Sequence, residues 1–431
     1  MANFSPTLDV SGTPDVADKN NGALVIITIL FFMWGLLTSL NDVLIPHLKA
    51  VYTLTYVQAM LVQFCFFGAY FLVSIPAGML IKRIGYQSGV VTGLVIAALG
   101  CLLFYPASTS GYGMFLFAFF VLAAGITVLQ VAANPYVTVL GSPATASSRL
   151  TLTQAFNSLG TTVAPALGGM LILSGATPAA ADLVRLSEAE QLAYRVNEAA
   201  AVQGPYLALG AALFALALFF ALAKLPRIAR RVPDSAGATG SLFVHRHLVL
   251  GAVGIFAYVG GEVSIGSFLI NFMGDGRIAG LNPAEAAPYV SYYWGGAMLG
   301  RFIGFGVMRR VSPGRALAFN AVCSMTLILA AIAGHGHLAM WALLAVGLCN
   351  SIMFPTVFSM ALHKLGPATG QGSGLLCMAI VGGAVLPFVQ GLLADFAGVQ
   401  LSFLVPAGCY LFILYFGLKY ANLYADKTGE A

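Results

Sequence analysis

Twelve apolar stretches, each of about 20 residues or more, constrain the fold of this chain more than any other feature. A helix of about 20 apolar residues crosses a bilayer, and backbone polar groups in lipid must be hydrogen-bonded within the chain. The hydrophobic share of 59%, against 8% charged residues, excludes a soluble globular protein. We therefore predict an all-α membrane protein with twelve transmembrane helices. The predicted spans are 23–49, 56–81, 86–107, 113–140, 151–174, 203–224, 248–273, 286–307, 315–334, 338–362, 370–394 and 401–421.

Basic residues are distributed unevenly between the two sides of these spans. Fifteen Lys and Arg residues fall on the side that carries both termini, and four fall on the other. The positive-inside rule then predicts that both termini are cytoplasmic. The basic clusters are interpreted as topology determinants, so no nucleic-acid partner is expected. The predicted parts are a cytoplasmic tail, a six-helix bundle, a cytoplasmic linker, a second six-helix bundle and a short cytoplasmic tail, at 1–22, 23–224, 225–247, 248–421 and 422–431.

The two predicted bundles carry a sequence repeat. Residues 160–169 and residues 382–391 both follow the pattern G-x4-P-x3-G, 222 residues apart. In the same way, Asn134 precedes Pro135 in the fourth span, and Asn350 stands before Pro355 in the tenth. Two parallel six-helix repeats are the architecture in which two bundles rock about a site at the middle of the membrane.

The first span contains one carboxylate, Asp42, beside Asn41. Ionised side chains within lipid are costly and usually face a protein interior or a water-filled path. This favours a cation site on a transport path. A second interpretation is that Asp42 is a hydrated residue near the mouth, because it lies roughly 27 Å along a helix that starts at Leu24.

Amide side chains are concentrated on the fourth and fifth spans. Gln130 and Asn134 are four residues apart and share a helix face, as do Gln154 and Asn157, three residues apart. Amides donate and accept hydrogen bonds, which suits a ligand made of hydroxyl groups. The alternative is that they join neighbouring helices. The predicted sugar-binding residues are these four together with Tyr258, Tyr293 and Asn350.

Glu262 and Arg301 are the other charged residues within the spans that need an explanation. One interpretation is an ion pair between neighbouring helices. The other is that Glu262 belongs to the cation path. The six cysteines show no metal-ligand spacing, so neither a disulfide nor a metal site is expected, apart from Na+ at Asp42 if sodium is the coupled ion. No phosphate-binding loop or other catalytic motif is present, so the chain is not predicted to be an enzyme or to need a cofactor.

Several motifs together resemble one known family. They are FMWG at 32–35, LNDVLIPH at 40–47, LQVAANPY at 129–136, QAFNSLG at 154–160, GEVSIGSF at 261–268 and NSIMFP at 350–355. Along all twelve spans the chain resembles a major facilitator superfamily sugar symporter of the fucose permease group, most of all its glucose/galactose transporter branch. The resemblance implies the major facilitator fold, proton coupling at Asp42, and sugar contacts at Gln154 and Asn157.

The chain departs from the fucose permeases at Gln130, where they carry a glutamate that belongs to the cavity. An amide cannot titrate, so a mechanism with two carboxylates in the first bundle is in doubt. The branch with Gln is associated with glucose and galactose, and in some members with sodium. The loop between the second and third spans also has Lys82 in place of the acidic residue usual in the superfamily.

We therefore predict a secondary active importer of neutral hexoses, coupled to Na+ or H+ by alternating access. Asp42, Asn41 and Glu262 are the predicted cation-coupling residues. The expected location is the bacterial cytoplasmic membrane, with a monosaccharide and the lipid bilayer as partners and a monomer as the functional unit. The alternatives are a proton-coupled exporter of small amphipathic compounds on the same fold and a sugar sensor that does not transport.

Overall fold

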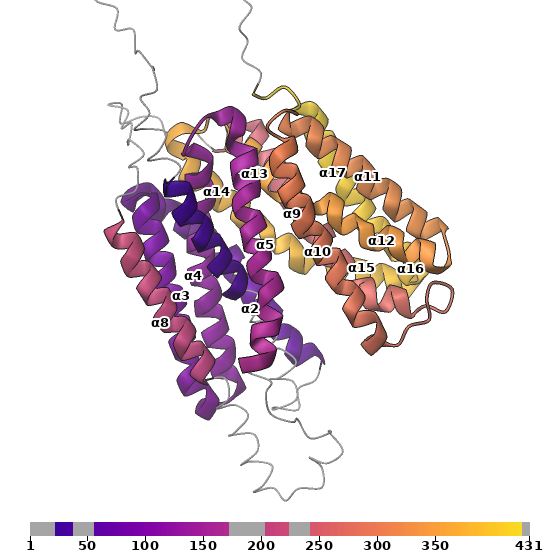
Figure 1. Cartoon of the computed structure of the whole chain (residues 1–431), viewed down its shortest axis with the longest axis horizontal. Helices are drawn as coiled ribbons and strands as arrows, with labels where there is room; N and C mark the ends of the chain where they lie inside the picture. The colour runs from indigo at the N-terminus through magenta and orange to yellow at the C-terminus, as the bar shows by residue number, and fades with distance from the viewer. Residues whose placement is uncertain (1–21, 38–55, 172–202, 224–241, 425–431) are drawn as a thin grey trace, which may run out of the picture.

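The computed structural model describes residues 22–37, 56–171, 203–223 and 242–424, and all regular structure within these ranges is helical. The helices form two bundles that lie side by side (Figure 1). The predicted twelve-helix fold is confirmed, because every predicted span coincides with helix over the residues that are described. Where a helix end is described, it agrees with the predicted end of the span to within about five residues, since Gly, Pro and basic residues mark most of the turns.

The first bundle begins with a helix at Gly22–Leu37, and the rest of the predicted first span, residues 38–49, lies outside the described residues. Tight turns at Gly85 and Gly111 join the next helices, and both glycines have a positive φ, near +84° and +90°, which side chains other than glycine rarely adopt. The helices are α2 Tyr56–Ile84, α3 Tyr86–Ser110, α4 Tyr112–Val139, η1 Pro143–Thr145, α5 Ala146–Leu171 and α8 Gln203–Leu222.

The second bundle contains spans built from more than one helix. The tenth span is broken between α12 and α13 just before Pro355, because proline removes a helix hydrogen bond and clashes with the preceding turn. The helices are η2 Leu242–Val244, α9 Arg246–Gly274, α10 Pro283–Val307, α11 Pro313–Ala333, α12 Gly336–Asn350, α13 Met353–Ala361, η3 Gly366–Ala368, α14 Thr369–Met378, η4 Ala379–Val381, α15 Gly382–Ala397, α16 Val399–Ser402 and α17 Leu404–Lys419.

Nine described helical segments are long and apolar enough to cross a membrane. The long helices α5 and α10 are not among them, because Thr, Gln, Asn and Ser in α5 and Gly, Tyr and Arg in α10 lower their hydropathy. These two helices pack against each other between the bundles. Polar residues of the two helices, such as Ser158 of α5 and Arg301 of α10, meet at the contact between the two halves of the chain.

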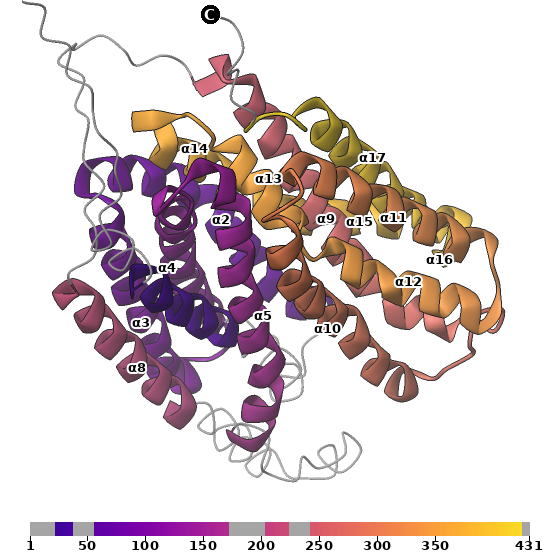
Figure 2. The same ribbon diagram turned by 45° about the horizontal axis from the view of Figure 1, so that its top comes forward.

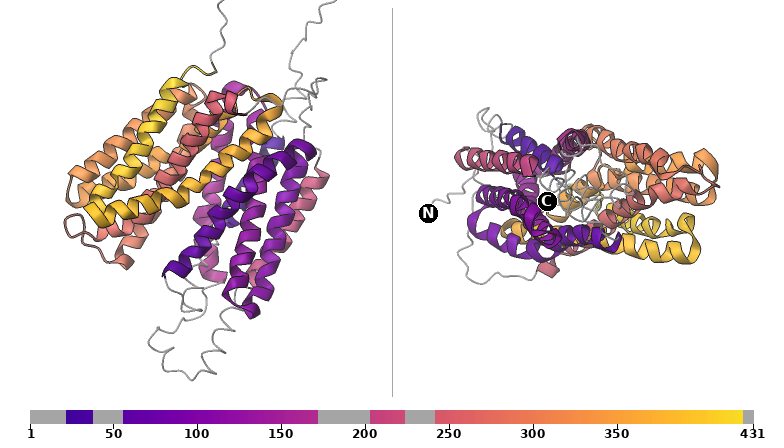
Figure 3. Two further views of the ribbon diagram at one scale, coloured as in Figure 1. Left: turned by 180° about the vertical axis from the view of Figure 1, so that it is seen from behind. Right: turned by 90° about the horizontal axis from the view of Figure 1, so that it is seen from below.

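The bundles meet at one end of the molecule, which we call the basic end because Lys82, Arg83, Arg309 and Arg310 stand at the helix ends there. Figures 1 and 2 show the bundles converging at α13 and α14, and the view from behind in Figure 3 shows α14 and α15 running obliquely from the second bundle to the end of the first. Helix α14 packs closely on α2, since a Cβ added to Gly374 would lie 2.6 Å from the carbonyl oxygen of Ser74.

Serine side chains complete the contact at the basic end. The hydroxyls of Ser147 in α5 and Ser359 in α13 are 2.6 Å apart. Ser148 donates to the carbonyl oxygen of Phe305 in α10 at 2.8 Å, one of the last carbonyls of that helix. The two bundles are therefore held at this end by neutral hydrogen bonds, and the short serine side chain lets the helices approach closely.

Candidate functional site

Two amides pair between α4 and α5 in the first bundle. Nε2 of Gln154 lies 3.5 Å from Oδ1 of Asn134, at the limit of a hydrogen bond, and Asn134 is fully buried. Among the described residues, Nδ2 of Asn134 has no acceptor. Gln130 lies one helical turn before Asn134 and is 4% exposed. A buried N–H group without an acceptor is unfavourable by about 1–3 kcal/mol, so this arrangement is suited to an additional acceptor.

Asn157 has a different environment from the other predicted sugar-binding amides. Its Nδ2 donates to the carbonyl oxygen of Phe31 in the first helix at 2.9 Å. The same two helices touch at Gly35, where an added Cβ would overlap the main chain of Asn157. In this structure Asn157 joins helices, which was the alternative to sugar contact, while its side chain stays half-buried. Its role in sugar binding remains a prediction.

A chain of hydrogen bonds crosses the second bundle. Tyr258 donates to Oε1 of Glu262 at 2.7 Å, one turn along α9. Tyr293 in α10 donates to the backbone carbonyl of Glu262 at 3.1 Å, and Nδ2 of Asn350 donates to the Tyr293 hydroxyl at 2.7 Å. Tyr410 in α17 donates to Oδ1 of Asn350 at 2.6 Å. The structure thus brings together four of the predicted residues.

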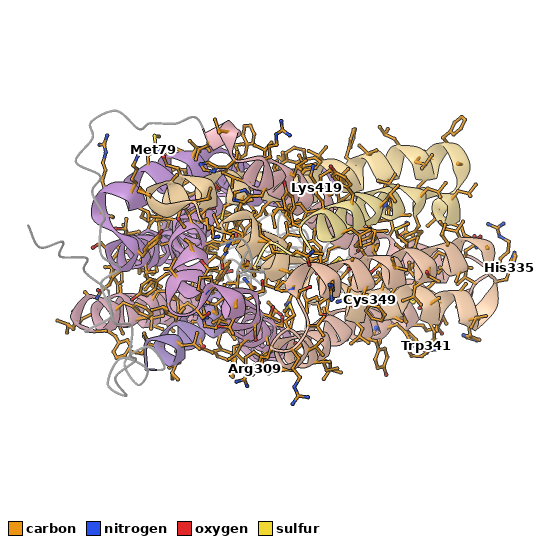
Figure 4. The ribbon with its side chains drawn as sticks, turned by 90° about the horizontal axis from the view of Figure 1, so that it is seen from above. Met79, Arg309, His335, Trp341, Cys349 and Lys419 are labelled. Atoms are coloured by element: carbon orange, nitrogen blue, oxygen red, sulfur yellow. The ribbon has the colours of Figure 1, made fainter. Side chains whose placement is uncertain are left out.

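Exposure separates Glu262 from the rest of this chain of hydrogen bonds. The three tyrosines and Asn350 are at most 1% exposed, whereas the Glu262 side chain is half-buried. In Figure 4, Cys349, the neighbour of Asn350 at the end of α12, lies near the middle of the molecule, whereas His335, before the start of α12, lies at its edge. Glu262 is therefore the least enclosed residue of this polar network.

Arg301 does not pair with Glu262. No ion pair joins the two side chains, although both are described, and Arg301 instead donates to the hydroxyl of Ser158 in α5 and to the carbonyl oxygen of Ser351 at 3.2 Å. The Ser351 carbonyl is available because the residue four positions later is Pro355, which has no N–H. The ion-pair interpretation is therefore wrong for this structure, and Arg301 instead links the two bundles next to the amide face of α5.

The corresponding proline in the first bundle exposes a carbonyl in the same way. Pro135 leaves the carbonyl of Val131 without its helical partner. Ser373 of α14, in the other bundle, donates to this oxygen at 2.9 Å. Both repeat-related prolines thus supply an acceptor to a side chain at the contact between the bundles.

Some residues of these contacts were not predicted from the sequence, and some predicted residues are not described. Sequence reasoning missed Tyr410 and Ser373, although a tyrosine hydroxyl in the middle of an apolar span requires a partner and could have been noticed. Asn41 and Asp42 lie outside the described residues, so their position relative to Glu262 stays a prediction. Among the described residues no group of three His, Cys, Asp or Glu side chains could hold a metal ion.

A family model and known proteins match this chain over most of its length. The family model of the Major Facilitator Superfamily matches residues 27–380. A glucose/galactose transporter of Brucella abortus is 56% identical over 421 residues, which cover 97% of this chain and 99% of the relative. An L-fucose-proton symporter of Escherichia coli is 36% identical over 397 residues, 90% of each chain.

Solved structures show the same fold. The crystal structure of a transporter named FucP in the outward conformation superimposes with a TM-score of 0.87 at 34% identity, covering 93% of this chain and 99% of that one. A structure of the Escherichia coli fucose:proton symporter gives a TM-score of 0.85 at 33% identity, covering 92% and 98%. The likeness therefore extends over both bundles and over the contact between them.

Proposed function

The chain belongs to the major facilitator superfamily, and we propose that it is a proton-coupled importer of neutral hexoses, with glucose and galactose as its substrates. The two bundles would expose a site between them alternately to either side of the membrane. The sugar would contact Gln130, Asn134, Gln154 and Asn157 in the first bundle. The name of the 56% identical relative supports this substrate class.

The observation that carries the proposal is the amide pair of α4 and α5. A neutral sugar offers hydroxyl groups that both donate and accept, so it needs amides rather than a charged clamp. Nδ2 of Asn134 lacks an acceptor in the described structure, and its Oδ1 has only the long contact to Gln154. A sugar hydroxyl that reaches this pair would satisfy the buried donor.

Two carboxylates are proposed to couple transport to the cation, Asp42 of the first bundle and Glu262 of the second. Gln130 cannot titrate, so Asp42 is the carboxylate that the first bundle would offer for proton binding. Glu262 is half-buried and is held by Tyr258. Relatives named fucose-proton symporters favour a proton over sodium.

We infer that the basic end is cytoplasmic, because Lys and Arg are enriched on the cytoplasmic side of bacterial membrane proteins. The contacts among Ser147, Ser359, Ser148 and Phe305 then close the cytoplasmic end in this structure. The match to a transporter solved in the outward conformation supports the same state. We propose a multi-pass protein of the bacterial cytoplasmic membrane that works as a monomer.

Uptake of radiolabelled glucose and galactose into proteoliposomes tests the proposal. An inward proton gradient in sodium-free buffer is compared with an inward sodium gradient at equal pH. We expect accumulation with the proton gradient and none with sodium alone. Accumulation that requires sodium would overturn the proton assignment, and no uptake of either sugar under any gradient would overturn the proposed function.

Asp42→Asn tests the coupling residue in the same vesicles. The variant cannot exchange a proton at this position, so we expect it to lose gradient-driven accumulation while it still exchanges internal for external sugar. Asp275→Asn is the matched control, because Asp275 is a carboxylate in an exposed loop paired with Arg277. Unchanged accumulation in Asp42→Asn would contradict the assignment.

A further inference from the structure

The hydrogen-bond chain of the second bundle has a direction. Tyr410 donates to Oδ1 of Asn350, and this fixes which end of the amide faces Tyr293. The amide then donates through Nδ2 to the Tyr293 hydroxyl. A tyrosine hydroxyl carries a single proton, so Tyr293 is left to donate to the carbonyl of Glu262. Tyr410 thereby determines where the proton of Tyr293 points, although it does not touch Glu262.

The segment of α9 around Glu262 needs such external support. Gly260, Gly261 and Gly266 flank the carboxylate, and glycine makes a helix less stable by about 1 kcal/mol per residue relative to alanine. An added Cβ at Gly260 would overlap Leu386 of α15, so close packing requires glycine at this position. Because these glycines weaken α9 locally, hydrogen bonds from other helices are needed to fix the position of Glu262.

Glu262 is held at two points as a result. Tyr258 binds the carboxylate from the same helix, and Tyr293 binds the backbone carbonyl from α10. The network is enclosed, since Tyr293, Asn350 and Tyr410 are fully buried. Within protein surrounded by lipid, a buried hydroxyl or amide that loses its partner finds no water to replace it. The arrangement is therefore kept as a unit.

We propose that Tyr410 is a positioning residue of the cation-coupling site, acting through Asn350 and Tyr293 to hold Glu262 where it can exchange a proton. This inference deepens the proposed function and rests on it. It also assigns Asn350 to this positioning chain, because both ends of its amide are engaged by tyrosines and none of its surface is exposed.

The charged and titratable groups that face Glu262 come from three helices. They are Tyr258 of α9, Tyr293 and Arg301 of α10, and Tyr410 of α17. The charge of Arg301 acts on the carboxylate from a distance and does not pair with it. Tyr410→Phe changes none of these charges, so an effect on proton coupling would have to pass through the hydrogen bonds.

The test compares Tyr410→Phe with Tyr415→Phe in proteoliposomes. Tyr415 lies on the same helix but is 47% exposed, and its hydroxyl accepts from Lys419. We expect Tyr410→Phe to reduce proton-driven glucose accumulation about fivefold. We also expect the midpoint of its pH profile to rise by about half a unit. A Glu262 side chain that is no longer held in place makes a weaker hydrogen bond with Tyr258, and this bond favours the charged carboxylate. Tyr415→Phe should match the wild type in both.

A second variant shows whether the effect passes along the chain. Tyr293→Phe removes the hydrogen bond to the backbone carbonyl of Glu262. It should therefore shift the pH midpoint as Tyr410→Phe does, and the double variant should shift it no further. Tyr293→Phe also carries the test if Tyr410→Phe does not fold. Wild-type pH profiles in both variants, or additive shifts in the double variant, would overturn the inference.

The outcome for the wild type keeps the two proposals apart. If the wild-type protein fails to accumulate sugar under any proton gradient, the proposed function fails whatever the tyrosine variants do. If the wild type accumulates sugar and Tyr410→Phe behaves identically, the proposed function stands and only the positioning role of Tyr410 is rejected.

Discussion

Asn134 and Asn350 stand at related places in the two bundles, one before Pro135 and the other before Pro355, yet their amides differ in hydrogen bonding. Asn350 accepts from Tyr410 at 2.6 Å and donates to Tyr293 at 2.7 Å. Asn134 has one long contact of 3.5 Å to Gln154, and its Nδ2 has no acceptor in the described part of the chain. Both side chains are fully buried.

The difference shows how one repeat can serve two tasks. The second bundle uses its amide inside a closed network that fixes the backbone of α9. The first bundle leaves hydrogen-bonding capacity unused on the face that carries the other predicted sugar contacts. Because buried polar groups are normally satisfied, the unsatisfied amide is the better candidate for a ligand contact. Under the proposed function, Asn350 would position and Asn134 would bind, and mutations should separate the two roles.

The largest expected effect is on stability, in Asn350→Ala. The substitution leaves the hydroxyls of Tyr293 and Tyr410 without their partners and opens a small cavity, which we expect to destabilise the protein by about 3 kcal/mol. Thermal unfolding of the detergent-solubilised protein measures this. Asn320→Ala on α11 is the control, since Asn320 is only half-buried. Equal losses in the two variants would show that Asn350 has no special structural role.

A smaller effect of a different kind is expected for Asn134→Ala. Less stability should be lost than in Asn350→Ala, because the cavity is similar but only the long contact to Gln154 disappears. Glucose affinity should fall about tenfold. Equilibrium binding of glucose measures the change. Thr127→Val serves as control on the same helix, because the Thr127 hydroxyl bonds within α4. Wild-type affinity in Asn134→Ala would remove this amide from the binding site.

Ser373→Ala tests the carbonyl that Pro135 exposes. The variant loses the hydrogen bond to Val131, which is expected to weaken the closed basic end by about 1 kcal/mol and to favour its opening about fivefold. The labelling rate of a cysteine introduced by Gly370→Cys reports this opening. Ser402→Ala, whose hydroxyl bonds within its own bundle, should leave the rate unchanged. Equal rates with and without Ser373 would contradict the prediction.

The smallest effect is expected at Asp275, far from both amides. Hydrogen bonds from Arg277 hold the pKa of the Asp275 carboxyl below its usual value. A lowered folded-state pKa stabilises the protein above the unfolded pKa of about 4, and this contribution is lost as pH falls through the folded value. The pair is exposed, so Asp275→Asn should not change thermal stability measurably at pH 7. A clear loss at pH 7 would show that exposed pairs matter as much as the buried network.

Sequence reasoning reached the fold, whereas the roles of the predicted site residues stay predictions. Helix number and ends follow from apolar length and from turn residues such as Gly85, because these signals are local. The amide faces of α4 and α5 also follow from helical spacing. The prolines of the two Asn–Pro sites expose carbonyl groups, but neither these carbonyls nor their partners were predicted from the sequence.

The remaining features depend on contacts between distant segments. Tyr410 and Ser373 bind groups 60 and 242 residues away, and no local pattern specifies such a partner. The position of Arg301 could not be predicted either, since its choice between Glu262 and the Ser351 carbonyl depends on how α10 packs against α5 and α12. Packing geometry, rather than residue type, decides these cases.

The Val131 carbonyl has a consequence for engineering this protein. The acceptor belongs to the main chain, so no replacement of the Val131 side chain can remove it. Pro135→Ala would restore an N–H group at position 135. This group could donate to the carbonyl oxygen of Val131 within α4 and so compete with Ser373 for the same oxygen. A designer could thus retune how readily the bundles part without altering a single side chain that contacts the opposing bundle.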